Sequence, residues 1–121
     1  MAFDEATAER VRKLLRRRQP VERKMMGGLC FMVDGAMCCA VSGKGGLLVR
    51  VDPSALERML AEPDVSPADM RGRRMTGFVR VAPEGYRTDA ALKTWIERGI
   101  AGIAARAAED ARKKPRPKKR T

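Results

Sequence analysis

The chain has 121 residues, enough for one domain and too few for two domains of ordinary size. Hydrophobic residues make up 44% of it and charged residues 34%, a balance typical of a folded globular protein. Histidine is absent, which excludes imidazole-based catalytic triads and the usual imidazole metal ligands. The composition therefore predicts one folded domain and removes many classes of enzyme.

The net charge of +11 is concentrated at the carboxyl end. Arg112–Thr121 holds seven of the 26 basic residues and no acidic residue, which leaves 19 basic against 15 acidic residues elsewhere. Beyond Ala111 the chain has no apolar side chain to bury, and its prolines oppose helix formation. We therefore predict a mildly basic folded domain over residues 1–108 and a disordered basic tail over residues 109–121.

The amino terminus and the cysteines both bear on localisation. Met1–Glu5 carries acidic residues where a secretory signal carries Lys or Arg, and no apolar run approaches the roughly 20 residues that span a bilayer. The three cysteines are an odd number in a chain too large to need disulfides, which favours a reducing compartment. We expect a soluble cytoplasmic protein.

The first half of the chain changes from helical to strand periodicity at Val21. Before it, Asp4 is a candidate N-cap for a helix that ends by Pro20, with a buried stripe of Phe3, Thr7, Val11, Leu14 and Leu15. From Val21 to Val51, short apolar runs alternate with turns at 27–28, 34–35 and 43–46. This pattern predicts an antiparallel meander.

The second half returns to helical periodicity twice. Asp52 and Pro53 suit the start of a short helix that stops before Pro63, and a polar loop should then run to Arg74. A strand is expected over 75–82, followed by a turn at 83–85. A long helix from Thr88 or Asp89 should bury Leu92, Trp95, Ile96, Gly99, Ile100 and Ile103. At least one of Gly99 and Gly102 should permit close backbone approach, because glycine costs about 1 kcal/mol inside a helix.

These elements predict an α+β fold: an antiparallel meander flanked by amino-terminal, middle and carboxyl-terminal helices in two layers. If residues 34–35 form a two-residue turn, Val33 pairs with Ala36. Counting outward from that pair places Phe31 opposite Cys38, and Cys30 opposite Cys39. Cys30 and Cys39 should then be neighbours, able to cross-link under oxidation.

Candidate chemical motifs are weak. The glycine run 43–46 lacks the spacing of a phosphate-binding loop and favours a hairpin turn. The three cysteines provide neither four ligands nor a Cys-x-x-Cys pair, so they favour buried structural thiols over a zinc site or a reactive nucleophile. No pair of carboxylates suggests general acid–base catalysis. The sequence predicts no catalytic, cofactor or metal site and no enzyme.

The run 23–35, which reads Arg-Lys-Met-Met-Gly-Gly-Leu-Cys-Phe-Met-Val-Asp-Gly, resembles the signature of the TfoX (Sxy) amino-terminal domain family. That signature is a Lys-Met-Phe-Gly-Gly stretch leading into a strand and a glycine hairpin, and Met26 stands here where an aromatic residue is commoner. Residues 75–78 resemble the family's Met-x-Gly-aromatic stretch, and 92–97 its terminal helix. The motif residues are Lys24, Met25, Gly27, Gly28, Phe31, Gly35, Gly77, Phe78 and Trp95.

The resemblance covers residues 3–105 and implies an α+β domain in a regulatory context linked to transformation competence. Full-length competence regulators of this family carry a second, helical domain, and here a basic tail follows instead, so the resemblance is to a stand-alone amino-terminal domain. It supplies no catalytic residue. Fold alone does not fix function.

Two functions follow. The first is a non-enzymatic regulatory adaptor that binds a regulatory protein partner, with the tail adding weak, non-specific attraction to DNA or RNA. The alternative is a nucleic-acid-binding protein that also uses Arg10, Lys13, Arg17, Arg71, Arg73 and Arg74; one contiguous positive face would favour it. In both, the predicted nucleic-acid contacts are Arg112, Lys113, Lys114, Arg116, Lys118, Lys119 and Arg120. No membrane partner is expected.

Overall fold

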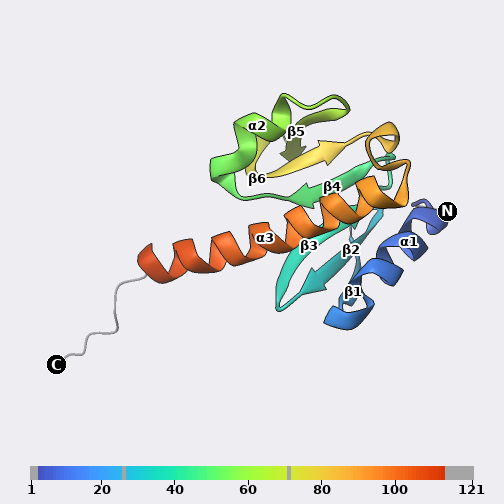
Figure 1. The fold of residues 1–121 in the computed structure, drawn as a ribbon, viewed down its shortest axis with the longest axis horizontal. Coiled ribbons are helices and arrows are strands. Elements are labelled where there is room, and N and C mark those ends of the chain that lie inside the picture. Colours follow the sequence, from blue (N-terminus) through green and yellow to red (C-terminus); the bar gives the residue numbers. More distant parts are fainter. Residues whose placement is uncertain (1–2, 26, 71, 114–121) are drawn as a thin grey trace.

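In the computed structural model, residues 3–25, 27–70 and 72–113 are described, and they form one antiparallel sheet with helices packed against it (Figure 1). The helices are α1 (Glu5–Leu15), α2 (Leu56–Leu60) and α3 (Asp89–Lys113), with 3₁₀ turns at Arg16–Arg18, Pro53–Ala55 and Pro83–Tyr86. The strands are β1 (Val21–Met25), β2 (Gly28–Val33), β3 (Ala36–Val41), β4 (Leu47–Arg50), β5 (Val65–Met70) and β6 (Arg73–Val81).

The strand order is β1-β2-β3-β4-β6-β5, and every neighbouring pair is antiparallel. The first four strands form the expected meander, and β6 pairs with β4 so that β5 becomes the second edge. Both central residues of the 34–35 turn have positive φ (53° and 82°), as a two-residue hairpin of this kind requires. The predicted α+β class with helices in one layer and a sheet in the other is confirmed.

Strand β5 corrects the prediction of a polar loop up to Arg74. Val65–Met70 pairs with β6, although the segment is polar and contains Pro67. Proline lacks the N–H that a central strand needs, but an edge strand leaves one side unpaired and tolerates it. The local composition therefore indicated a loop where the chain forms the edge of a sheet.

A β-bulge at Cys38 corrects the predicted cysteine register. The pairs Val33–Ala36 and Met32–Met37 follow the hairpin, but the register then shifts, so that Cys39 faces Phe31 and Cys30 faces Ala40. An extra residue in one strand displaces all later pairs by one and turns their side chains to the other face. Cys30 and Cys39 are therefore not the opposed pair that the uninterrupted hairpin predicted.

Helix α3 lies across β3 and β4, and α1 packs beside α3 (Figure 1). The buried face of α3 carries Leu92, Trp95 and Ile96, as predicted. Gly99 provides the expected close approach, because a Cβ there would lie 2.8 Å from the carbonyl oxygen and from the Sγ of Cys38. The helices therefore pack tightly against one face of the sheet.

The predicted N-cap of α1 is confirmed, but one residue that was predicted to be buried in this helix is exposed. The Asp4 carboxylate accepts hydrogen bonds from the Ala6 N–H at 3.1 Å and from Thr7 Oγ1 at 2.7 Å. The helix ends at Leu15, well before Pro20, and continues as a 3₁₀ turn. Leu14 was expected in the buried stripe, but it is 36% exposed.

Helix α3 extends beyond the predicted domain boundary at residue 108. Its last residues, up to Lys113, are helical, and Figure 1 shows that this end projects past the sheet. Alanine favours helix in this stretch, and Arg106 pairs with Asp110 one turn later at 3.6 Å. The described residues do not include the side chains of Arg112 and Lys113 or any part of 114–121. The nucleic-acid contacts predicted for the tail therefore lie outside the described residues.

Candidate interaction surface on the open face of the sheet

Strand alternation gives the two faces of the sheet different side chains. Phe31, Val49 and Val79 point toward the helices and are fully buried. The alternate positions point to the opposite face, which carries a groove of about 270 Å³. We call it the methionine groove; its apolar lining is Met25, Cys30, Met37, Ala40, Leu48 and Met75.

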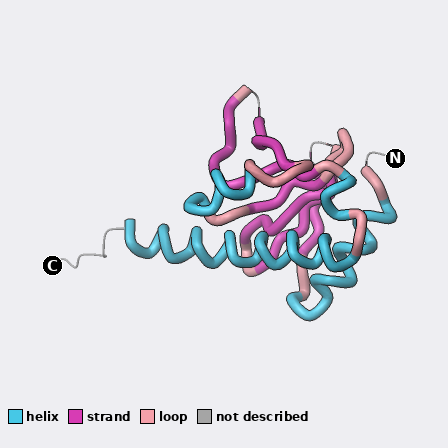
Figure 2. The backbone as a smooth tube through the Cα atoms, turned by 45° about the horizontal axis from the view of Figure 1, so that its top comes forward, coloured by secondary structure: helices cyan, strands magenta, loops and turns pink. Residues whose placement is uncertain are grey.

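The outer part of the β5–β6 hairpin forms one wall of this groove. β6 pairs with β4 only over Phe78–Val81, and the register between β5 and β6 shifts after Pro67. Beyond that point the hairpin leaves the sheet and projects from it, as Figure 2 shows. Asp69 and Met75, both from this projecting part, line the groove.

Basic side chains predominate around the methionine groove. Lys44 and Arg80 line it, with Asp69 as the one acidic lining residue in the described part of the chain. Arg80 donates a hydrogen bond from Nη1 to Ser42 Oγ at 3.3 Å, which positions its guanidinium at the groove. Arg23 is exposed on the neighbouring edge strand, on the same face as its partner Cys30. The groove thus combines an apolar floor with a positive rim.

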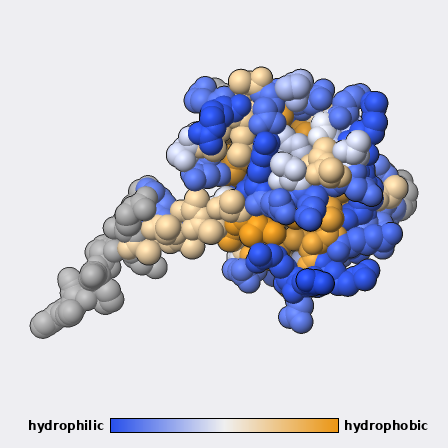
Figure 3. Space-filling model, viewed as in Figure 1, coloured by the Kyte–Doolittle hydropathy of each residue, from blue (hydrophilic) through white to orange (hydrophobic). Residues whose placement is uncertain are grey.

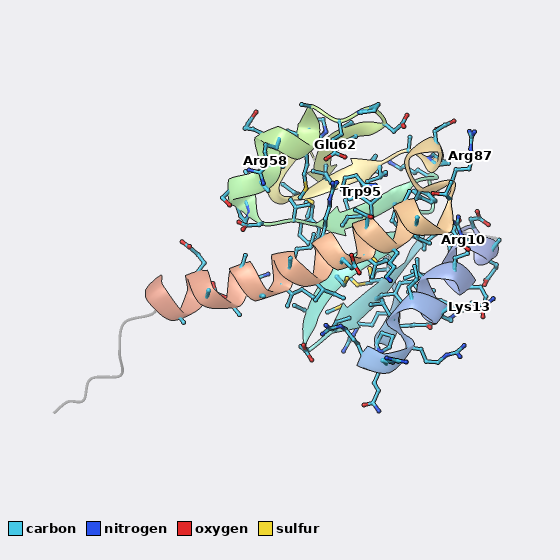
Figure 4. The ribbon with its side chains drawn as sticks, in the orientation of Figure 1. Arg10, Lys13, Arg58, Glu62, Arg87 and Trp95 are labelled. Atoms are coloured by element: carbon cyan, nitrogen blue, oxygen red, sulfur yellow. The ribbon has the colours of Figure 1, made fainter. Side chains whose placement is uncertain are left out.

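Most family-motif residues have structural roles. Phe31 is fully buried, and Trp95 is buried beneath Arg98, whose Cζ lies 4.4 Å from the ring centroid. Arg98 also pairs with Glu62 at 3.0 Å, which links α3 to the end of α2; Figure 4 shows Trp95 and Glu62 on the same side of α3. These contacts hold the helix layer together.

The motif glycines Gly27 and Gly35 adopt positive φ in the turns that precede and follow β2. Gly28 is needed for a different reason, since a Cβ there would lie 2.6 Å from the Val41 carbonyl oxygen. Phe78 is buried beneath Arg50, and Gly77 has open space around it. The glycine-rich part of the signature is therefore explained mainly by turn and strand geometry.

Two motif residues are exposed and lack such a structural role. Lys24 pairs with Leu29, so its side chain belongs to the helix side of the edge strand, and Met25 belongs to the open face. Met25 is 49% exposed and lines the methionine groove together with Gly28. The sequence signature and the groove therefore coincide at this end of β1 and β2.

The three cysteines are buried, as predicted. Cys38 lies against α3, with its Sγ 3.8 Å from the Ile96 carbonyl oxygen. The hydrogen bond with Cys38 and complete burial raise the pKa of Cys39, and burial also raises the pKa of Cys30. In the described part of the chain, no group of three or more Cys, Asp or Glu residues is arranged to hold a metal ion.

The basic residues of the globule fall into two groups. Arg10 is held by structural contacts, because its Nη2 donates to the carbonyl oxygens of Tyr86 and Arg87 and pairs with Asp89. Lys13 is exposed in the last turn of α1 (Figure 4), and Arg17 is exposed in the 3₁₀ turn that follows. Arg73 is exposed on the distant β5–β6 hairpin, and the side chains of Arg71 and Arg74 lie outside the described residues. The basic residues that were predicted to contact nucleic acid from the globule are thus divided between separate parts of the molecule.

A second hollow lies between α1 and α3 and has a volume of about 620 Å³. Leu14, Ile96 and Ile100 provide its apolar surface, and Figure 3 shows hydrophobic surface below α3. Its polar lining mixes signs: Arg17, Arg18, Lys93, Asp34 and Glu97. It contains none of the motif residues, so the methionine groove is the stronger candidate.

The sequence named Met25 and Gly28 only as family-motif residues and did not predict the groove that they line. Met37, Leu48 and Met75 come from three different strands, and only the sheet order brings them together. For Met37 and Leu48 the signal was alternation, because β3 and β4 carry apolar or small residues on both faces, more than a solvated face needs. Arg50 was also missed, although a charged residue within the apolar run 47–51 marks an unusual position.

The fold and the groove define a two-layer α+β domain with one covered and one open sheet face. The family model described as "TfoX N-terminal domain" matches residues 13–103, most of the chain, and the chain belongs to this family. This is a regulatory family, and the match supports a competence-regulator-like domain. No curated protein and no solved structure matches the chain. Within the described residues, no helix has both the length and the apolar character that a membrane crossing requires.

Proposed function

We propose that this chain is a non-enzymatic regulatory adaptor that acts through protein–protein contacts at the methionine groove. The observation that carries the proposal is the coincidence of the exposed motif residue Met25 with an apolar groove on the uncovered face. Methionine side chains are flexible and polarisable, and they suit surfaces that adapt to a partner. Membership of a regulatory family favours a binding role over catalysis.

The partner should present an apolar segment flanked by acidic residues. Lys44 and Arg80 at the groove, with Arg23 on the adjoining strand, give the rim its positive charge. Strand β1 is an edge with all five residues exposed, so its free backbone groups can pair with an extended peptide. Strand addition beside an apolar groove is a known mode of peptide recognition.

Met25→Glu tests the adaptor role, with Val21→Glu as the matched control. Both residues lie on β1 and on the open face, with 49% and 56% exposure, but only Met25 lines the groove. In the native host, Met25→Glu should abolish the regulatory phenotype and the capture of one specific partner, and Val21→Glu should retain both. Titrating the purified partner should shift the methyl signals of Met25, Met37 and Met75. Equal effects of the two substitutions, or methyl signals that stay unchanged, would contradict the proposal.

Nucleic-acid binding is a second candidate function, favoured by the basic cluster at the end of α1. Lys13, Arg16, Arg17 and Arg18 are exposed there and form no ion pair within the described residues. The predicted contacts in the tail would extend this positive charge. Backbone phosphates attract such clusters without reading sequence.

Deleting Arg112–Thr121 tests this second function. If the tail makes about five contacts to single-stranded nucleic acid, the affinity of the full chain should fall on the order of a hundredfold between 50 and 200 mM salt. The shortened chain should lose most of this binding, and a scrambled oligonucleotide should bind as well as any other. An unchanged salt slope after deletion would assign binding to the globule, and no binding by either form at low salt would refute the function.

A further inference from the structure

Arg50, the last residue of β4, is more than nine-tenths buried, with 7% of its surface exposed. Its Nε–H donates to the Met37 carbonyl oxygen at 2.6 Å, and its guanidinium lies over Phe78, with Cζ 4.6 Å from the ring centroid. The hydrogen bond and the stacking fix the plane of the guanidinium. They use only one of its five N–H donors.

The charge of Arg50 has no carboxylate counterpart within the described part of the chain. None of the ion pairs found there includes it, and its two terminal nitrogens have no hydrogen-bond partner among those residues. Burial, and after it the neighbouring Arg106, lowers the pKa of Arg50, and the nearby Cys38 opposes this in part. A buried cation beside a second cation is an unfavourable arrangement unless an anion compensates it.

Helix α3 is shaped around the Arg50 side chain. A Cβ at Gly102 would lie 3.0 Å from Arg50 Cγ and 3.0 Å from the Val51 backbone, so the helix contains glycine where the arginine stem passes. Arg106 follows Gly102 by four residues and therefore lies on the same face of α3. The helix thus makes room for one arginine and places a second beside it.

We propose that Arg50 and Arg106 form a binding site for a phosphate group, a role independent of the adaptor function. The terminal nitrogens of a guanidinium match two oxygens of a phosphate, and two arginines match its double charge. Arg106 is 59% exposed and pairs with Asp110 at 3.6 Å, a surface contact weak enough to open when a phosphate arrives. Arg50 is the buried anchor, and Arg106 is the exposed second contact.

Titrating the full chain with sodium phosphate at constant ionic strength tests this site. The Nε–H signals of Arg50 and Arg106 should shift and saturate in ¹⁵N NMR spectra, with a Kd of about 1 mM, and sodium chloride should produce no such shift. Arg106→Gln should weaken binding about tenfold, the loss of one charge-assisted contact. Arg58→Gln is the matched control, an exposed arginine on α2 (Figure 4), and should leave the affinity unchanged.

Arg50→Lys keeps the charge but loses the flat pair of nitrogens, so it should weaken phosphate binding more than Arg106→Gln does. Because Arg50→Lys changes a buried residue, the exposed Arg106→Gln variant keeps the test decisive if the lysine variant does not fold.

A short single-stranded oligonucleotide distinguishes the sources of phosphate. Arg106-dependent displacement of free phosphate by the oligonucleotide identifies a nucleic-acid backbone, and binding of free phosphate alone identifies a small phosphate ligand. No saturable shift, or equal weakening by Arg58→Gln, would overturn the site.

Discussion

The two faces of this sheet use the same strands for different purposes. On the helix side, Phe31, Val49 and Val79 are fully buried against α1 and α3. On the open side, Cys30 and Ala40 form a floor of small residues, and methionines surround it. Side chains of consecutive residues alternate between these faces, so one residue step separates the core from the candidate site. This separation allows the open face to change chemically while the core remains intact.

Cysteine reactivity gives the largest expected contrast between the faces. In the native protein, Cys30 should be alkylated about a thousandfold faster than Cys38 and Cys39, because reaching Cys30 requires only side-chain movement in the groove, whereas the other two require unfolding of the core. A time course with peptide mapping by mass spectrometry measures the three rates. Equal rates would show that the open face is as tightly closed as the helix side.

Shortening one side chain on each face of the sheet measures how much that face contributes to the free energy of unfolding. Phe31→Ala should lower the free energy of unfolding by about 3–5 kcal/mol, because the ring is fully buried in the core. Cys30→Ala, one residue away on the other face, should lower it by about 1 kcal/mol or less. Urea unfolding of both variants measures the difference. Similar losses would contradict the division of roles between the two faces.

The close contact between α3 and β3 is a third test of the helix side. Gly99→Ala should destabilise the protein by about 1–3 kcal/mol, because the new Cβ would lie 2.8 Å from Cys38. Ala101→Gly, at an exposed position in the same helix, should cost about 1 kcal/mol from helix propensity alone. If Gly99→Ala stabilised the protein by that same amount, propensity and not contact would govern the position. Thermal and urea unfolding both report these changes.

The sequence allowed the local elements to be predicted better than their long-range arrangement. The turn at 34–35, the caps at Asp4 and Asp52 and the buried face of α3 depend on neighbouring residues, and all were predicted. The bulge at Cys38 was not predicted, because the run Ala-Met-Cys-Cys-Ala permits uninterrupted pairing. The local sequence pattern contains no information about the contact between Cys38 and α3. The edge strand β5 was missed because Pro67 indicates a loop unless the unpaired edge is known.

The candidate site was harder to predict than the fold. Its walls come from β1, β3, β4 and the β5–β6 hairpin, and their juxtaposition depends on the insertion of β6 beside β4. Two residues of the family signature, Met25 and Gly28, lie at one end of the groove, but the signature alone did not predict a groove there. The uncompensated charge of Arg50 becomes visible only when the positions of all described carboxylates are known. The chemistry of a site that is assembled from distant strands can therefore be predicted only after the strand order is known.

The smallest expected effect concerns the pair Arg12–Glu22, which fastens α1 to the helix side of the edge strand β1. Arg12 donates to the two carboxylate oxygens of Glu22 at 2.6 and 2.9 Å, and these bonds lower the pKa of Glu22 below its usual value of 4.5. A lowered pKa in the folded state means that the pair stabilises the protein above pH 4.5. This contribution is lost as the pH falls through the lowered pKa.

Glu22→Gln should therefore reduce the free energy of unfolding at pH 7, and the gap to the wild type should close progressively below pH 4.5. Glu57→Gln is the control, since Glu57 is exposed on α2 and forms no ion pair within the described residues. Urea unfolding between pH 3 and pH 8 measures both gaps. A Glu22→Gln gap that stayed constant down to pH 3 would mean that Arg12 does not stabilise the ionised carboxylate, and that α1 is held to the sheet by its apolar contacts alone.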